Sequence, residues 1–288
     1  MAVVRKAIIP VAGMGTRFLP ATKAIPKELL PLVDKPVIQF IVEELRDSGV
    51  EEIIFVTNES KIAIERHFER DEPLECVLHE KNKHAELNAI KECVGLARYI
   101  FIPQTEPLGL GHAVLQARSI IHDEPFIVCG GDDVVEGEPA AKELIEVYQK
   151  YGGSVVGVQE VPKDEVDRYG IVTPEKKLDD TLVKISDIIE KPPVEEAASN
   201  LAVSGRWLLT PEIFDHLEKT EPGAGGEIQL TDAIRSLMKE QDVYAKTYSG
   251  VYRDCGNKAE YVKAVLSFAL KNEEVKDKLK EFIKQLDI

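Results

Sequence analysis

Apolar residues in this chain occur as short runs that alternate with segments of helical periodicity. Short β-branched runs bounded by glycine, proline or polar residues are typical of buried strands, whereas apolar positions three and four residues apart predict helices. Strands are predicted at Ala7–Val11, Glu52–Thr57, Tyr99–Pro103, Pro125–Cys129 and Ser154–Gln159, with helices at Pro36–Asp47, Lys61–Glu69, Gly111–Ile121 and Ala140–Tyr151. This alternation predicts an α/β fold, in which a mixed, mostly parallel, Rossmann-like sheet is flanked by helices.

The pattern changes near Val161, where short strands separated by turns replace the alternation. They indicate a small antiparallel insert or lid, followed by two helices, a strand and a helical C-terminal segment. The strands are predicted at Gly170–Thr173, Leu182–Glu190, Leu201–Leu209 and Val243–Tyr248, and the helices at Pro211–Glu218 and Leu230–Lys239. The C-terminal helix carries one apolar stripe, made of Val275, Leu279, Phe282, Ile283 and Leu286.

These elements suggest one main domain at residues 1–256, with halves at about 1–160 and 161–256. Residues 257–288 are expected to form C-terminal helices that pack against the body or against a sister subunit. Ligands of open α/β sheets bind beyond the carboxyl ends of the strands. The loops that follow the predicted strands are therefore where chemistry is expected.

Charge narrows the classes of partner. The net charge is −15, so we expect no nucleic-acid or membrane partner, since either would require a basic face. The first 40 residues are nevertheless locally basic, which suggests a site for a small anion. The four cysteines show no metal or disulfide spacing and are expected to be reduced and mostly buried, and with no signal-like or membrane-spanning run the protein is expected to be cytoplasmic.

A glycine-rich loop, Ala12-Gly13-Met14-Gly15-Thr16-Arg17-Phe18, follows the first predicted strand. Glycines allow backbone N–H groups to approach and hold phosphates. Phe18 stands where a dinucleotide fingerprint requires a third glycine, and no Gly-Lys-Ser/Thr run completes a P-loop. The loop instead carries Arg17 and leads to Lys27, cations that suit a triphosphate, although a tight surface turn with solvated charges would give the same pattern.

Acidic residues follow two later strands. Asp132 and Asp133 come after Gly130-Gly131 at the end of a predicted strand, and Asp254 precedes a Gly-Asn turn. Carboxylates in such positions suit Mg²⁺, which completes its coordination with phosphate and water. Asp132 and Asp133 could equally form a turn, and Asp254 could cap the next helix. The sequence does not decide which of Asp132 and Asp133 would meet the metal.

Taken together, these segments resemble the bacterial UTP–glucose-1-phosphate uridylyltransferases, a branch of the sugar-nucleotidyltransferase family. The matching stretches run in order from residue 9 to residue 261. They are IPVAGMGTRFLPATKAIPKELLPLVDKP, QTEPLGLGHAV, GGDDVV, RYGIV, IIEKP, SNLAVSGRW, GAGGEIQLTDAI and RDCGNKAEY. The chain departs from the pattern at Gly130 and Gly131, where a bulkier apolar residue or proline is expected before the acidic position.

The resemblance implies a role for each matching position, with a nucleotide-binding first half and a sugar-binding second half. Arg17 and Lys27 would be catalytic cations on the triphosphate, and Asp132 and Asp254 would hold Mg²⁺. The nucleotide would be bound by Ala12, Gly13, Gly15, Glu28, Gln104 and Gly109. The sugar phosphate would be bound by Gly170, Glu190, Lys191 and Val203. His112 and Trp207 are read mainly as packing residues.

The implied reaction joins UTP and glucose 1-phosphate into UDP-glucose and pyrophosphate, without a covalent intermediate. The family often forms homodimers or homotetramers. Three alternatives stay open: the same chemistry with dTTP or an N-acetylated sugar phosphate, a catalytically silent binding protein, and an NAD-dependent dehydrogenase. Phe18 and the absence of a ribose-binding acid near residue 33 argue against the last.

Overall fold

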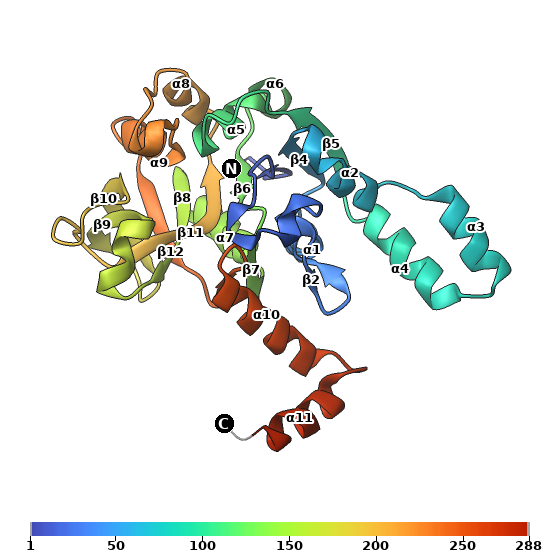
Figure 1. Cartoon of the computed structure of the whole chain (residues 1–288). Coiled ribbons are helices and arrows are strands. Elements are labelled where there is room, and N and C mark those ends of the chain that lie inside the picture. The colour runs from blue at the N-terminus through green and yellow to red at the C-terminus, as the bar shows by residue number, and fades with distance from the viewer. Residues whose placement is uncertain (1, 287–288) are drawn as a thin grey trace.

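A nine-stranded sheet forms the centre of the molecule in the computed structural model, which describes residues 2–286 apart from the side chain at position 224 (Figure 1). The strands lie in the order β5-β4-β1-β6-β11-β8-β12-β10-β9. Their bounds are β1 (Lys6–Pro10), β4 (Glu52–Thr57), β5 (Arg98–Pro103), β6 (Phe126–Cys129), β8 (Ser154–Glu160), β9 (Gly170–Lys177), β10 (Leu182–Glu190), β11 (Leu201–Leu209) and β12 (Val243–Thr247). The α/β class predicted from the sequence is confirmed.

The sheet contains both parallel and antiparallel strand pairs. β5, β4, β1 and β6 are parallel neighbours, and β8 is parallel to β12. β11 lies antiparallel between β6 and β8, and β9 and β10 continue the sheet with antiparallel pairings. The antiparallel strands expected as an insert are thus part of the main sheet. A single pairing of Ala202 with Ile171 brings β9 back to β11, so this half of the sheet curls toward itself.

Helices cover both faces of the sheet. Because side chains alternate along a strand, Ala7 and Ile9 of β1 belong to one apolar cluster and Ile8 belongs to the other. The first cluster includes α1 (Val37–Asp47) and α7 (Ala140–Tyr151). The second includes α5 (Leu110–Gln116), α6 (Arg118–Ile121), α8 (Ile213–Leu217) and α9 (Leu230–Leu237). The single helix expected at Gly111–Ile121 is divided into two helices, α5 and α6, at Ala117.

Two pairs of helices extend beyond the sheet and its covering layers (Figure 1). After α2 (Ile62–Phe68), α3 (Glu72–Glu80) and α4 (His84–Val94) form an arm that the apolar pattern did not predict. The second pair, α10 (Lys258–Lys271) and α11 (Lys276–Gln285), occupies the expected C-terminal helical segment. No described helix combines the length and apolar character needed to cross a bilayer.

Four short strands lie outside the main sheet. β2 (Pro31–Leu32) pairs with β3 (Lys35–Pro36), and β7 (Asp133–Glu136) pairs antiparallel with β13 (Val251–Asp254). The second pair sets Asp254 directly opposite Asp133. It therefore brings two acidic segments together that are far apart in the sequence.

Candidate active site

The glycine-rich loop leaves β1 and stays attached to the end of β4. Val11 N donates to Val56 O at 2.8 Å, and Asn58 Nδ2 donates to Ala12 O at 2.8 Å. Gly15 has a φ of 66°, a left-handed conformation that favours glycine. Beyond it the chain forms three single 3₁₀ turns rather than a helix, because Pro20 and Pro26 cannot donate the hydrogen bonds of a continuous helix. The loop therefore passes over Lys27 instead of continuing away from the sheet.

An aromatic contact connects this loop to α10. The rings of Phe18 and Tyr261 meet edge to face with centroids 5.5 Å apart, and Tyr261 Oη donates to Pro31 O at 2.8 Å. Edge-to-face geometry is favourable between aromatic rings. Phe18 and Tyr261 both lie in motifs that match the family, but their contact with each other could not be predicted from those motifs.

Lys27 and Asp132 form an ion pair across the strand ends. Lys27 Nζ lies 2.6 Å from Asp132 Oδ2, although the two residues are 105 positions apart. Burial alone would lower the pKa of Lys27, but the carboxylates of Asp132, Glu28 and Asp133 raise it above its ordinary value. Lys27 is therefore a cation held at the acidic end of the site.

Asp132 and Asp254 converge on one small space. A β-carbon added to Gly256 would lie 2.4 Å from Asp132 Oδ2 and 2.9 Å from Asp254 Oδ1. Burial, followed by repulsion from Asp132, raises the pKa of Asp254, and the positive charges of Arg17 and Lys27 act in the opposite direction. Arg17 is thus close enough to influence Asp254 electrostatically. The two predicted cations and the two predicted metal ligands lie in one neighbourhood.

Asp133 is directed away from this space. Its carboxylate lies against Gly130 and Gly205, where an added β-carbon would come within 1.9 Å and 2.1 Å of Asp133 Oδ2. Tyr252 Oη donates to Asp133 Oδ1. Burial, together with the charges of Asp132 and Asp254, raises the pKa of Asp133 to about 7. The glycine at position 130 thus makes room for this half-buried acid, which accounts for the departure noted in the sequence.

A pocket of about 250 Å³ opens beside Lys27. It is lined by Ala12, Gly13, Lys27, Glu28, Gln104 and Gly109, with Pro10, Pro107, Leu110, Ala113 and Glu227 completing the wall. Five of the six residues predicted to bind the nucleotide are thus brought together. The sixth, Gly15, lies against Thr22 and Lys27 rather than in the pocket wall. Glu227 was not predicted, although the motif that contains it was quoted.

Glu28 has a buried carboxylate with one free oxygen. Its Oε2 accepts from Lys61 Nζ at 2.9 Å, whereas Oε1 is buried without a hydrogen-bond partner among the described residues. Burial raises the pKa of Glu28, and the nearby Lys61 and Lys27 oppose this effect. A buried acceptor without a partner is rare, and a donor from a bound ligand that reached it would satisfy it.

The predicted sugar residues surround the end of β10. Gly170 of β9 pairs with Glu190 of β10, and Thr231 Oγ1 donates to Glu190 Oε2 at 2.7 Å. Lys191 Nζ lies 3.7 Å from Glu190 Oε1, and Lys191 itself has a φ of 47°. Val203 lies on β11 beside Ala202, which pairs with β9. The contact of Thr231 with Glu190 was not predicted from the sequence.

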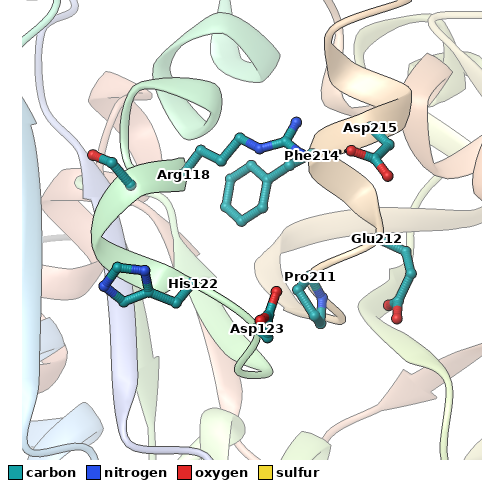
Figure 2. Close-up of a pocket in the computed structure, with 8 residues that line it drawn as sticks. Arg118, His122, Asp123, Pro211, Glu212, Phe214 and Asp215 are labelled. Carbon is teal, nitrogen blue, oxygen red and sulfur yellow. Dashed lines mark hydrogen bonds and ion pairs between the residues drawn. The ribbon is translucent and has the colours of Figure 1, made fainter.

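Another hollow, of about 570 Å³, lies at the opposite end of the sheet. Its lining includes Arg118, His122, Phe214 and Asp215 (Figure 2). It is bordered by the turn that precedes β6 and by the segment that follows β11. Arg118 is already paired with Asp215 at 2.6 Å and with Glu218 at 2.7 Å. None of the predicted site residues lines this hollow, so we assign the candidate site to the other end.

The fold and this arrangement of charges define a class of protein. The chain belongs to the nucleotidyl transferase family, whose profile matches residues 6–270. It is 50% identical over 286 residues to the UTP–glucose-1-phosphate uridylyltransferase of Staphylococcus epidermidis, with 99% of each chain covered. The Staphylococcus haemolyticus protein of the same name is 50% identical over 284 residues, with 98% of each chain covered.

Solved structures of similar fold point to the same family. A UTP-bound UGPase from Acinetobacter baumannii superposes with a TM-score of 0.92 at 40% identity, covering 99% of this chain and 100% of the other. A UDP-glucose pyrophosphorylase in complex with UDP-glucose gives a TM-score of 0.86 at 39% identity, covering 94% and 100%. The resemblance inferred from the sequence motifs is therefore confirmed.

Proposed function

We propose that this chain is a uridylyltransferase that joins UTP and glucose 1-phosphate to give UDP-glucose and pyrophosphate. The observation that carries the proposal is the ion pair of Lys27 with Asp132 at the mouth of the pocket lined by Gln104 and Glu28. It sets a cation and a carboxylate where a bound nucleotide would present its phosphates. Relatives of this name are half identical along nearly the whole chain, which supports the same conclusion.

In the proposed reaction, a phosphate oxygen of glucose 1-phosphate forms a bond with the α-phosphorus of UTP. The bond from that phosphorus to the β-phosphate oxygen breaks, and pyrophosphate leaves with the electron pair. The attacking phosphate is already ionised near neutral pH, so no general base is needed. Catalysis then depends on positioning and on charge stabilisation, for which Arg17 and Lys27 are the candidate groups.

The acidic pair fits a divalent cation of the size and preference of Mg²⁺. Asp132 and Asp254 offer carboxylate oxygens that face the same space, which is the donor type that Mg²⁺ prefers. When bound, Mg²⁺ would neutralise phosphate charge and orient the triphosphate. The side chain of Asp133 points away from this space, so we propose that Asp133 is not a metal ligand.

Substrate recognition is proposed for the remaining predicted residues. Ala12, Gly13, Gln104 and Gly109 would contact the nucleoside, with Glu28 accepting a hydrogen bond through its free oxygen. Glu190, held by Thr231, would accept from sugar hydroxyls, with Gly170 and Val203 beside it. Lys191 would bind the sugar phosphate. The boundary between a nucleotide half and a sugar half near residue 160 stays a prediction.

Pyrophosphate release tests the proposal. The purified chain should release pyrophosphate with UTP, glucose 1-phosphate and Mg²⁺, and EDTA should stop the release. Comparing kcat/KM for UTP and dTTP, and for glucose 1-phosphate and N-acetylated sugar phosphates, separates the alternatives that the sequence left open. Absence of turnover with every pair would favour a silent binding protein and contradict the proposal.

We further propose that the enzyme is a homodimer or homotetramer assembled through its C-terminal helices and that it works in the cytoplasm. Phe282 of α11 is 56% exposed and Val262 of α10 is 64% exposed, more than apolar side chains on a covered helix would be. All four cysteines are free thiols, which fits a reducing compartment. Light scattering during size exclusion measures the assembly state directly.

A further inference from the structure

His112 lies behind the wall of the nucleoside pocket and contacts the side chain of Gln104. It is on the first turn of α5, and its Nδ1 lies 3.1 Å from Gln104 Nε2. The same Gln104 Nε2 donates to Gly109 O at 3.2 Å. His112 itself does not line the pocket, whereas Gln104 and Gly109 do. The imidazole therefore acts on a pocket residue without facing the ligand.

These two contacts fix which end of the Gln104 carboxamide faces the pocket. A main-chain carbonyl only accepts hydrogen bonds, so the group beside Gly109 O must be the NH₂. That NH₂ has two hydrogens, and the second meets His112 Nδ1, which consequently accepts. A neutral imidazole then carries its proton on Nε2, which lies 3.1 Å from Gln116 Nε2. Gln116 Nε2 also donates to His112 O at 3.3 Å, so Gln116 must give up this contact and turn its oxygen toward the imidazole. Half-buried Gln116 can replace the lost contact with water, whereas buried Gln104 needs Gly109 O as the acceptor for its NH₂.

The oxygen of the same carboxamide remains free. Within residues 2–286, no group donates to Gln104 Oε1, and this oxygen is not among the sealed polar atoms that lack a partner. It is accordingly open to the pocket that Gln104 lines. An amide oxygen accepts from an N–H group and repels a lone pair. Uracil presents an N–H at N3, whereas cytosine presents a lone pair at the same position.

We propose that His112 is a positioning residue that sets nucleobase specificity by holding Gln104 Oε1 toward the base. With its NH₂ occupied by Gly109 O and His112 Nδ1, Gln104 accepts from a pyrimidine with N3–H and rejects one whose N3 is an acceptor. Loss of the His112 acceptor leaves only the 3.2 Å contact with Gly109 O to hold the NH₂, so the carboxamide turns more readily and can offer its NH₂ to cytosine. This inference rests on the proposed function, because it takes Gln104 as the residue that contacts the base.

The selectivity for UTP over CTP tests the inference, measured as the ratio of the two kcat/KM values with glucose 1-phosphate. His112→Leu and His112→Phe both remove the acceptor, and His112→Asn retains an acceptor oxygen near the position of Nδ1. We expect the first two to lower the ratio about tenfold, the order of one lost hydrogen bond, and His112→Asn to restore most of it. We use two variants that lack the acceptor in case one of them fails to fold. One of them suffices for the test if its thermal midpoint shows that it is folded.

The ratio for UTP over dTTP supplies an internal control. Thymine has the same N3–H as uracil, so this ratio should stay within about twofold in every His112 variant. Equal losses of both ratios would indicate a merely structural role and would overturn the inference. Gln116→Leu, which changes the other neighbour of the imidazole, should leave both ratios unchanged.

Gln104→Leu distinguishes failure of the inference from failure of the proposed function. If Gln104→Leu reduces the UTP over CTP ratio and the two acceptor-free His112 variants do not, Gln104 contacts the base and His112 does not position it. If Gln104→Leu leaves the ratio unchanged, the proposed contact between Gln104 and the base is itself wrong. Only a joint fall in Gln104→Leu and in each acceptor-free His112 variant that folds supports the inference.

Discussion

Lys27 holds its ammonium group 2.6 Å from Asp132 Oδ2, and its pKa is raised by the surrounding carboxylates despite burial. It is consequently charged across the range in which enzymes of this kind are assayed. In the proposed reaction this charge stabilises the departing pyrophosphate. Removal of one preorganised donor from the oxyanion hole of an acyl-transfer site costs on the order of 10²-fold in kcat, and we use this as the scale.

We therefore predict that Lys27→Ala lowers kcat for UDP-glucose formation on the order of 10²-fold or more. Lys23→Ala is the matched control, because Lys23 is an exposed lysine on the same loop and makes no ion pair with another described residue. Its kcat should stay within about twofold of the parent. Normal turnover by Lys27→Ala would remove Lys27 from the mechanism.

The neighbouring residues Asp132 and Asp133 should differ sharply in their response to the same substitution. Asp132→Asn removes a carboxylate that faces Asp254 and is expected to raise the Mg²⁺ concentration needed for half-maximal activity and to lower kcat on the order of 10²-fold. Asp133→Asn preserves size and an acceptor for Tyr252, so its Mg²⁺ dependence should stay close to that of the parent. A Mg²⁺ titration of both variants measures the difference, and the reverse order would make Asp133 the ligand.

The helix α10 contacts the glycine loop through Tyr261. Most side chains of that loop are exposed, and the Phe18–Tyr261 contact with the hydrogen bond to Pro31 O is one of the few attachments that hold it. Because Phe18 follows Arg17 directly, movement of the ring would displace the guanidinium. The helix is thus expected to influence catalysis without contacting substrate.

Tyr261→Leu should lower kcat/KM for UTP by about tenfold, because it removes both the ring contact and the hydrogen bond. Tyr261→Phe keeps the ring and loses only the hydroxyl, so most of the activity should return. Steady-state kinetics at varied UTP, with thermal unfolding to confirm folding, measures both effects. Equal kinetics for the leucine variant and the parent would show that α10 does not position the loop.

Much of the element order could be predicted from apolar patterning, for physical reasons that also explain what was missed. β4, β10, β11 and α7 have the predicted bounds because each is a continuous apolar run or an amphipathic stripe. The arm of α3 and α4 is largely exposed, so it lacks a continuous apolar stripe. β7 and β13 are short, and their pairing depends on residues that are distant in the sequence.

The meeting of Lys27 with Asp132 follows from a topological rule, since parallel strands bring their carboxyl ends to one edge. The contacts among side chains could not be predicted in this way. Glu227, Thr231, Tyr252 and Tyr261 enter the site through packing of segments that sequence periodicity does not place relative to one another. The quoted motifs contained three of these four residues, so the motifs located the region and left the roles open.

Arg206, a fully buried cation on β11, connects several elements of the fold. Its guanidinium donates to Glu44 of α1 through Nε at 3.1 Å and Nη2 at 2.7 Å, and Nη2 also donates to Asp133 O at 2.8 Å. Glu44 Oε1 accepts in turn from Ala141 N at the start of α7. One ion pair thus connects the sheet, two helices and the strand that follows Asp132. Nothing in the apolar pattern of β11 predicts a buried arginine there.

Because burial of an unpaired charge costs far more than burial of a matched pair, removal of one partner should be more harmful than removal of both. We predict that Arg206→Met or Glu44→Leu alone lowers the free energy of unfolding by about 3 to 5 kcal/mol, whereas the double variant that combines Arg206→Met with Glu44→Leu recovers a large part of the loss. Urea denaturation of the two single variants and the double variant measures these energies, provided that the slopes agree. Additive losses would mean that the two side chains act independently. A recovered double variant with low kcat would show in addition that the pair positions the β7 strand, since Asp133 O would have lost its donor while the fold remained stable.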